Sequence, residues 1–274
     1  MILQYLGTAA AEGIPGVFCS CKICETSREK RGKDIRTRSQ AIIYADKLGE
    51  GNSNERLLID LPPDTYLHVI RDNLRMEKIG HLLITHSHSD HFYPKELEFR
   101  SGVFANPSPD FPLNIYGNET VSKICEEFDF DIHIAENFKP FKAGVFIVTA
   151  LPAAHARNER CLIYMIEMGS KRILYGNDTG FFPEETWDYI KGKSFDFISL
   201  DCTFCGLKEG TNHMGVPDII EVEAKLKSLG CLKDNTQIII HHFSHNGGLL
   251  HDELVELADK HGYGVSYDGG VWEI

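Results

Sequence analysis

One short segment constrains this chain of 274 residues more than any other. The octapeptide Thr-His-Ser-His-Ser-Asp-His-Phe (85–92) directly follows three apolar residues, Leu-Leu-Ile. If a buried strand ends at this point, His86 and His88 lie two positions apart and point in the same direction. Asp90 and His91 then come where the chain turns toward a helix, and they reach a second point nearby. The segment therefore predicts a rigid strand end that carries four polar side chains.

Imidazole and carboxylate groups together are ligands for a borderline divalent metal ion. Two such ions held a few Å apart are a common arrangement for hydrolysis. A histidine-rich turn can also be a solvated loop, or its Ser and Asp residues can cap a helix. Four ligand-type residues within six positions, behind an apolar strand, favour the metal site. The structural context has to test this interpretation.

The composition sets the size of the fold and the kind of ligand. With 42% hydrophobic residues, the chain can form a substantial core, and we expect one domain over residues 1–274. The 28 Lys and Arg against 40 Asp and Glu give a formal charge of −12. This sign argues against an extended nucleic-acid surface and against membrane binding. It leaves room for a small anionic substrate at a locally positive site.

The N-terminal residues have neither a basic stretch followed by an apolar one nor a small-residue cleavage site. No run approaches the roughly 20 apolar residues that span a bilayer. We therefore expect a cytoplasmic protein. In a reducing compartment, the cluster of Cys19, Cys21 and Cys24 indicates a metal site rather than disulfides.

Strand-like and helix-like runs alternate along the whole chain, which predicts an α/β fold. The expected strands are Ile2–Gly7, the hairpin Ala41–Ala45 and Arg56–Asp60, His81–Thr85, Leu113–Tyr116, Ile132–Ala135, Val145–Ala150, the hairpin Cys161–Met168 and Lys171–Tyr175, Phe195–Leu200, Gln237–His241 and Tyr263–Tyr267. The expected helices are Pro63–Met76, Pro94–Phe99, Glu119–Phe128, Pro183–Ile190, Pro217–Leu229 and Asp252–Lys260. Residues 9–39 are expected to form an ordered excursion, and residues 47–55 and 106–112 a turn and a loop.

Further ligand-type residues follow other apolar strands. His155, Asp178 and His242 each come just after one. Taken singly, these are weak signals, because a lone histidine is more often structural and an Asp in Asn-Asp-Thr-Gly is more often a turn residue. Their recurrence in order after the octapeptide strengthens the metal interpretation. Loops at the ends of neighbouring strands can bring such side chains together on a rigid scaffold.

The seven residues resemble, in identity and order, the ligand pattern of the metallo-β-lactamase superfamily, and the resemblance extends over nearly the whole chain. It implies the metallo-β-lactamase fold, a four-layer αββα sandwich, with two divalent ions. By that pattern one ion is held by His86, His88 and His155. The second ion is held by Asp90, His91 and His242, and Asp178 bridges both. The family spacing also favours His242 over its neighbour His241, since strand alternation lets only one of them face the site.

Such a site has a physical rationale for hydrolysis. Five neutral imidazoles and two carboxylates around two divalent ions leave a net charge of about +2. This charge lowers the pKa of a bridging water and attracts an anionic phosphodiester. Asp90 can orient that water or take its proton. The ligand types accept zinc or manganese, and also iron or nickel.

The cysteine cluster indicates a particular branch of the superfamily. Three thiolates leave tetrahedral zinc one ligand short, and His245, three residues after His242, supplies a fourth candidate. This arrangement, together with the segments 7–15 and 267–274, is similar to PhnP-type proteins, the phosphoribosyl cyclic phosphate phosphodiesterases. The resemblance implies one structural zinc, hydrolysis of a small cyclic phosphate such as phosphoribosyl 1,2-cyclic phosphate, and a homodimer.

His213 matches a family position that acts as general acid on the leaving oxygen, although it can also be an ordinary loop histidine before a helix. Arg157, Asn158 and Arg160 are candidates for binding a substrate phosphate, or they are solvated loop residues. The alternative functions are another hydrolase of the superfamily (a lactonase, thioesterase or RNA-processing nuclease) and an accessory protein like PqqB. The acidic charge gives no sign of a basic RNA-binding arm, and the full set of seven ligands argues against lost catalysis.

Overall fold

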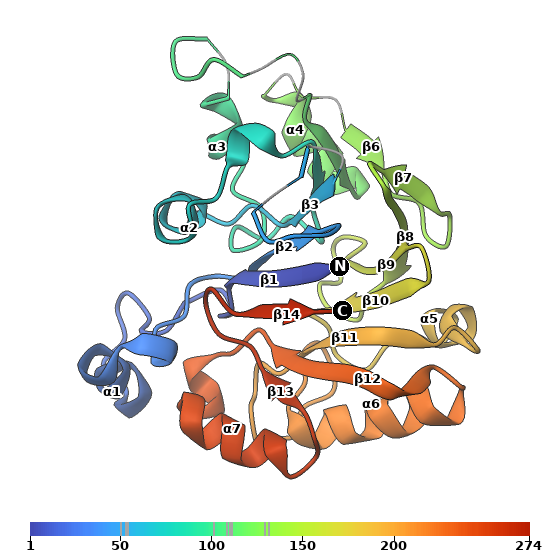
Figure 1. Cartoon of the computed structure of the whole chain (residues 1–274). Coiled ribbons are helices and arrows are strands. Elements are labelled where there is room, and N and C mark those ends of the chain that lie inside the picture. The colour runs from blue at the N-terminus through green and yellow to red at the C-terminus, as the bar shows by residue number, and fades with distance from the viewer. Residues whose placement is uncertain are drawn as a thin grey trace.

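The computed structural model describes residues 1–49, 51–52, 55–100, 102–107, 109, 112–128, 130 and 132–274. Two mixed seven-stranded sheets pack face to face, and helices cover their outer faces (Figure 1). The expected αββα sandwich is therefore confirmed. The two chain termini lie side by side, because the last strand pairs with the first. No helix in the described part of the chain is long and apolar enough to cross a membrane.

The first sheet is antiparallel on one side and parallel on the other. Its strands, in spatial order, are β14 (Val271–Glu273), β1 (Ile2–Gly7), β2 (Gln40–Tyr44), β3 (Arg56–Ile59), β4 (His81–Leu83), β5 (Asn114–Gly117) and β6 (Ile132–Ile134). Its helices are α2 (Thr65–Asp72), α3 (Lys95–Glu98) and α4 (Glu119–Glu126).

The second sheet repeats this mixture, with the antiparallel strands β7 to β10 followed by parallel pairing from β10 to β13. Its strands are β7 (Phe141–Ala143), β8 (Phe146–Pro152), β9 (Leu162–Met168), β10 (Lys171–Gly176), β11 (Phe195–Asp201), β12 (Leu232–His241) and β13 (Gly264–Val265). Its helices are α5 (Glu184–Ile190), α6 (Val216–Ser228) and α7 (His251–Asp259).

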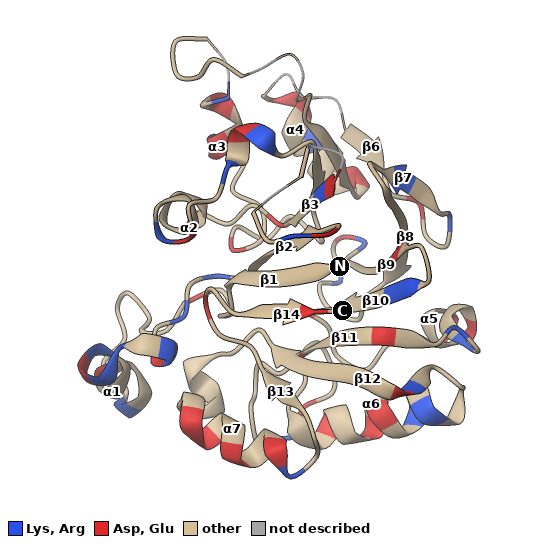
Figure 2. Cartoon of the chain, viewed as in Figure 1, with Lys and Arg blue, Asp and Glu red and all other residues tan. Residues whose placement is uncertain are grey.

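Three apolar clusters hold the layers together. One fills the space between the sheets, one lies under α5, α6 and α7, and one lies under α2, α3 and α4. Strands β4 and β11 lie in the interior of their sheets, with a neighbouring strand on each side, and they are buried along their whole length. Acidic residues recur along α7, whereas helix α1 carries both basic and acidic residues (Figure 2).

Several sequence-based boundaries were wrong. Residues 9–39 contain the helix α1 (Lys22–Lys30), and the strands β7 and β14 were missed because each has only three residues. The helix expected over residues 63–76 is α2, which ends at Asn73 in the left-handed conformation (φ 51°). The turn expected at 47–55 and the loop at 106–112 lie partly outside the described residues.

A buried histidine joins α2 to the first sheet and should make stability depend on pH. The ring of His68 lies 2.5 Å from Gln40 Oε1 and 2.7 Å from Thr37 Oγ1, and burial lowers its pKa to about 3. Below pH 6.5 His68 binds a proton in the unfolded chain but not in the folded chain. The free energy of unfolding therefore falls as the pH falls toward 3. We expect His68→Gln to remove about 2 kcal/mol of the difference between pH 7 and pH 5. Urea unfolding at both pH values measures this. Exposed His261→Gln is the control, and an unchanged pH dependence in His68→Gln would contradict the assignment.

Candidate metal centre

The predicted ligands come together at one edge of the sandwich. His86–His91 follow β4, His155 follows β8, Asp178 follows β10 and His242 follows β12. Both sheets therefore contribute to one site, and each contribution comes from the end of a strand in the core. His86, Asp90, His91, Asp178 and His242 are all buried.

Three imidazole nitrogens converge in the first half of the site. His86 Nε2 lies 2.9 Å from His88 Nδ1, and His155 Nε2 lies 3.2 Å from the same atom. Asp178 Oδ2 is 3.2 Å from His86 Nε2. One ligand atom of each of these four residues falls within 4.8 Å of the others, which is close enough to surround one ion. The structure thus brings together the three histidines that the resemblance groups around one ion.

The second half of the site is built around His91. Its Nε2 lies 3.3 Å from Asp90 Oδ2, 3.1 Å from Asp178 Oδ2 and 3.2 Å from His242 Nε2. These four residues form a second group whose ligand atoms lie within 4.8 Å of one another. Asp178 belongs to both groups, so its carboxylate lies where a bridging ligand would.

The side chains present fit a pair of divalent cations. Asp178 Oδ1 is buried and makes no hydrogen bond, although His155 Nδ1 and His213 Nδ1 each lie 3.2 Å away. A buried carboxylate oxygen without a hydrogen bond is costly unless something else neutralises it. Imidazole and carboxylate donors are those that zinc and manganese accept. The donor set therefore fits divalent cations, and Asp178 offers a carboxylate oxygen to each of the two groups.

Three residues at the same place have a strained backbone. Asp178 (φ 54°) and His242 (φ 65°) both adopt the left-handed conformation, as does Asp60 (φ 65°) at the end of β3. This conformation costs free energy for residues other than glycine and persists where the surroundings over-determine it. Here it turns the side chains at the strand ends into the site.

Asp60 is a functional residue that the sequence reasoning missed. Its carboxylate lies 2.7 Å from His91 Nδ1 and accepts hydrogen bonds from the backbone and hydroxyl of Thr85. This contact leaves His91 Nε2 to face the metal site, as carboxylate partners of metal-binding histidines do. Burial would lower the pKa of His91, but Asp90 and Asp60 raise it well above 6.5. A bound ion would therefore take the place of a proton on His91.

Glu159 was also missed, and it joins the loops of the two sheets. It accepts hydrogen bonds from Ser87 N (3.0 Å), Ser87 Oγ (2.7 Å) and Asn118 Nδ2 (2.8 Å). Ser87 lies between the ligands His86 and His88, and Asn118 caps α4 by accepting from Val121 N. The loop that carries His155 is thus tied to the loop that carries the octapeptide.

Removing the hydrogen bonds that Glu159 accepts should weaken metal binding without unfolding the chain. We expect Glu159→Ala to lower the affinity for the ion at His86, His88 and His155 by about 10–100-fold, as is typical when a partner that orients metal ligands is lost. Metal titration followed by calorimetry measures this. Glu167→Ala is the matched control, because Glu167 pairs with Arg172 on the β9–β10 hairpin. Equal affinities in the two variants would exclude a positioning role.

His213 lies beside the site and has two acidic neighbours. Its Nδ1 is 3.2 Å from Asp178 Oδ1 and 3.2 Å from Asp201 Oδ2. Burial would lower the pKa of His213, but these two carboxylates raise it to about 10. Asp201 and Thr203, which no sequence signal singled out, complete the group, because Thr203 Oγ1 lies 2.9 Å from His242 Nδ1 and donates to Asp201 Oδ2 at 3.0 Å.

The expected phosphate-binding residues differ in their surroundings. Arg157 and Asn158 are exposed on the loop after His155, and their contact with a substrate stays a prediction. Arg160 has a different role from the expected one. It pairs with Glu119 and donates to Asn137 Oδ1 and Ala135 O, so its guanidinium braces neighbouring segments.

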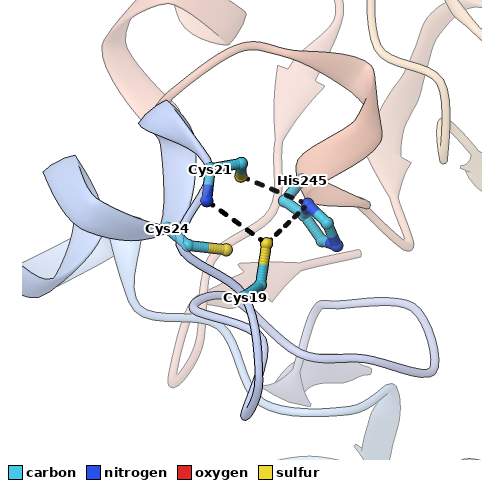
Figure 3. A group of neighbouring side chains, drawn as sticks. All are labelled: Cys19, Cys21, Cys24 and His245. Carbon is cyan, nitrogen blue, oxygen red and sulfur yellow. Dashed lines mark hydrogen bonds between the residues drawn. The ribbon is translucent and has the colours of Figure 1, made fainter.

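The cysteine cluster forms a second, separate group of ligand atoms (Figure 3). Cys21 Sγ lies 3.4 Å and Cys19 Sγ 3.7 Å from His245 Nδ1, and Cys24 completes the group within 4.8 Å. Burial would raise the pKa of Cys21, but the backbone amide of Cys24 and the neighbouring thiols lower it to about 6. Three sulfurs and one imidazole nitrogen fit the donor set of a structural zinc site.

The two sheets, the outer helices and the paired clusters at the strand ends define a protein of the metallo-β-lactamase fold, with the ligands of a metal-dependent hydrolase. A family model of the beta-lactamase superfamily domain matches residues 55–243. Because this match covers more than half of the chain, the chain belongs to that superfamily.

Individual relatives are distant. An octanoyltransferase of Porphyromonas gingivalis is 24% identical over 284 residues, which cover 96% of this chain and 50% of that protein, so the chain spans half its length. The crystal structure of a diphosphatase from the PhnP family covers 100% of this chain and 97% of its own (20% identity, TM-score 0.72). Zinc-bound PqqB from Methylobacterium extorquens covers 100% of both chains (18% identity, TM-score 0.74). At these identities, the two structures show a shared fold.

Proposed function

We propose that this protein is a metal-dependent phosphodiesterase that acts on a small cyclic phosphate, with phosphoribosyl 1,2-cyclic phosphate as the model substrate. The observation that carries the proposal is the position of His213. Its imidazole lies within 3.2 Å of Asp178, which belongs to both metal groups, and two carboxylates favour its protonated form. A proton donor next to a pair of metal sites suits a reaction with a poor alkoxide leaving group.

The residues of the site can each be given a role in this reaction. Two divalent ions in the paired groups would supply Lewis acidity and a water of lowered pKa. His213 donates a proton to the oxygen that leaves the phosphorus. Asp201, fully buried, holds the imidazole through its Nδ1 and stabilises its charge. Asp90, whose pKa is lowered chiefly by His91 against the effect of burial, stays a carboxylate that can orient the attacking water.

The fold likeness to a diphosphatase of the PhnP family is consistent with phosphoryl chemistry, and the cysteine cluster matches the expectation for PhnP-type proteins. The proposed partner is a small anionic phosphodiester, bound by a homodimer. The proposed metals are zinc or manganese at the paired site and zinc at the cysteine cluster.

A substrate panel tests the proposal directly. The protein, loaded in turn with zinc and with manganese, is assayed with bis-p-nitrophenyl phosphate and a ribose 1,2-cyclic phosphate, and with a lactone, a thioester and a tRNA precursor. We expect turnover of the phosphodiesters and a preference for the cyclic sugar phosphate. Turnover of the lactone, the thioester or the RNA alone would contradict the proposal.

An accessory protein like PqqB is the second candidate, because PqqB shares the fold over the full length of both chains. The complete set of ligands and the adjoining His213 favour catalysis over an accessory role. Inactivity on the whole panel, in a protein shown to contain both ions at the paired site, would favour the accessory function.

A further inference from the structure

The first turn of α1 carries two cysteines in the arrangement of a dithiol pair. Cys21 is the N-cap residue of this nine-residue helix, and Cys24 lies three positions later. Cys21 is half-buried and Cys24 is buried. A helix N-terminus stabilises a thiolate, and a Cys-X-X-Cys segment at such a position is typical of pairs that cycle between thiols and a disulfide. The sulfurs that can bind zinc are thus also arranged to bond to each other.

The cluster is compact enough for this reaction. The ligand atoms of Cys19, Cys21, Cys24 and His245 all lie within 4.8 Å of one another. The two cysteines share one helical turn, so side-chain rotation brings their sulfurs toward a bonding distance of about 2.05 Å. Figure 3 shows the sulfurs of Cys21 and Cys24 on the same side of the turn as the His245 ring.

Solvent reaches one side of the cluster, and Cys21 itself is half-buried rather than buried. An open hollow of about 470 Å³ adjoins the cluster, and Cys19 and His245 form part of its wall. Phe18, at the same hollow, is fully exposed. The sulfur that a peroxide meets first has to be accessible, as half-buried Cys21 is, whereas Cys24 needs to reach only Cys21 and a buried cysteine such as Cys231 reaches neither.

The cluster is mechanically connected to the candidate metal centre. His245 lies three residues after His242 in one short segment. Ser244 N donates to Thr203 O at 3.2 Å, and Thr203 Oγ1 lies 2.9 Å from His242 Nδ1. An ion bound to His245 would therefore help to fix the segment that presents His242, and its loss would leave that segment freer to move.

We propose that Cys21 and Cys24 form an oxidation site at which a peroxide produces a disulfide and displaces the zinc. The Cys21 sulfur attacks one oxygen of hydrogen peroxide, the O–O bond breaks, and the hydroxide that leaves takes up a proton to become water. The Cys24 sulfur attacks the resulting sulfenic sulfur, the S–S bond forms, and a second hydroxide leaves as water. Two electrons pass from the two sulfurs to the peroxide. The disulfide would leave only Cys19 and His245 of the four residues that would hold a zinc ion, so the cluster would no longer retain it.

The distribution of lysine and arginine makes the product easy to identify. Trypsin cleaves after Lys22, between the two cysteines, and produces the peptides 1–22 and 23–28. A disulfide between Cys21 and Cys24 joins these peptides, whereas one between Cys19 and Cys21 stays inside the first. Cys19→Ser should keep the cross-link and Cys21→Ser should lose it. Cys231→Ser is the matched control at a buried, remote thiol.

The experiment treats the zinc-containing full chain with hydrogen peroxide. A chromophoric chelator records zinc release, mass spectrometry records the linked peptides, and hydrogen exchange follows residues 242–250. We expect one zinc per chain to be released with the cross-link and faster exchange in that segment, all reversed by dithiothreitol and zinc. The proposal would be overturned if the treated protein kept its zinc and both free thiols, or if it released zinc without forming the cross-link. It would also be overturned if the cluster bound no zinc.

Only the catalytic consequence, a reversible loss of phosphodiester hydrolysis, rests on the proposed function. If the protein hydrolyses no phosphodiester, the proposed function fails, while zinc release and the linked peptides still decide this inference.

Discussion

Replacing Asp178 with asparagine is expected to abolish hydrolysis and to reduce the metal content of the paired site. The carboxylate lies within 3.2 Å of nitrogens of His86, His91 and His155, and it is the one residue common to both metal groups. Asparagine keeps the shape and tolerates the left-handed backbone at this position, so the change removes mainly the charge. Since metal catalysis is worth several kcal/mol, we expect kcat/KM to fall about 10³-fold or more.

The measurement combines bis-p-nitrophenyl phosphate kinetics with elemental analysis of the dialysed protein. Asp188→Asn is the matched control, because Asp188 is exposed on α5. Its rate and metal content should equal those of the unmodified protein. A variant at Asp178 that kept two ions and full activity would show that the paired groups are not the catalytic centre.

Local patterns predicted the alternation of strands and helices and the candidate ligand residues, whereas the four-layer arrangement was implied by the resemblance to the metallo-β-lactamase superfamily. The apolar residues before the octapeptide indicated a buried strand, and β4 is buried throughout. Polar residues placed just after such runs had to meet at one edge, and His155, Asp178 and His242 do meet the octapeptide there.

The missed residues have in common that their partners are distant in sequence. Asp60 approaches His91 across 31 positions, and Glu159 approaches Ser87 across 72. An acidic residue at a strand end or in a polar loop is ordinary by itself, and only the packing of the two sheets gives it a partner. The same holds for Asp201, which the sequence showed only as a polar residue at the end of an apolar strand.

The short strands were not predicted for a different reason. Three residues, as in β7 and β14, are too few to establish a period of two. Strand β14 forms only because β1 offers an open edge, to which Val271, Trp272 and Glu273 pair. Tertiary pairing rather than local propensity creates such strands.

The role of His213 predicts a dependence on the leaving group. A general acid matters most when the departing oxygen is a poor leaving group, and little when it departs as a stable phenolate. We therefore expect His213→Gln to slow hydrolysis of a cyclic sugar phosphate or an alkyl phosphodiester by about 10²–10⁴-fold. The loss with bis-p-nitrophenyl phosphate should be far smaller. Steady-state kinetics on both substrates, at a fixed metal content verified for each sample, measures the difference.

The partners of His213 sharpen the test. Asp201→Asn should lower the rates of hydrolysis of the two substrates in the same pattern as His213→Gln, but by smaller factors. Asp201 Oδ2 holds His213 at 3.2 Å and does not itself reach the leaving group. The same oxygen lies 3.4 Å from His242 Nδ1, so a lowered metal affinity in this variant separates support of His242 from support of the acid. His261→Gln, an exposed histidine, should leave both rates unchanged. Equal losses on both substrates in His213→Gln would assign that residue to substrate or metal binding, because loss of a proton donor cannot slow a phenolate and an alkoxide alike.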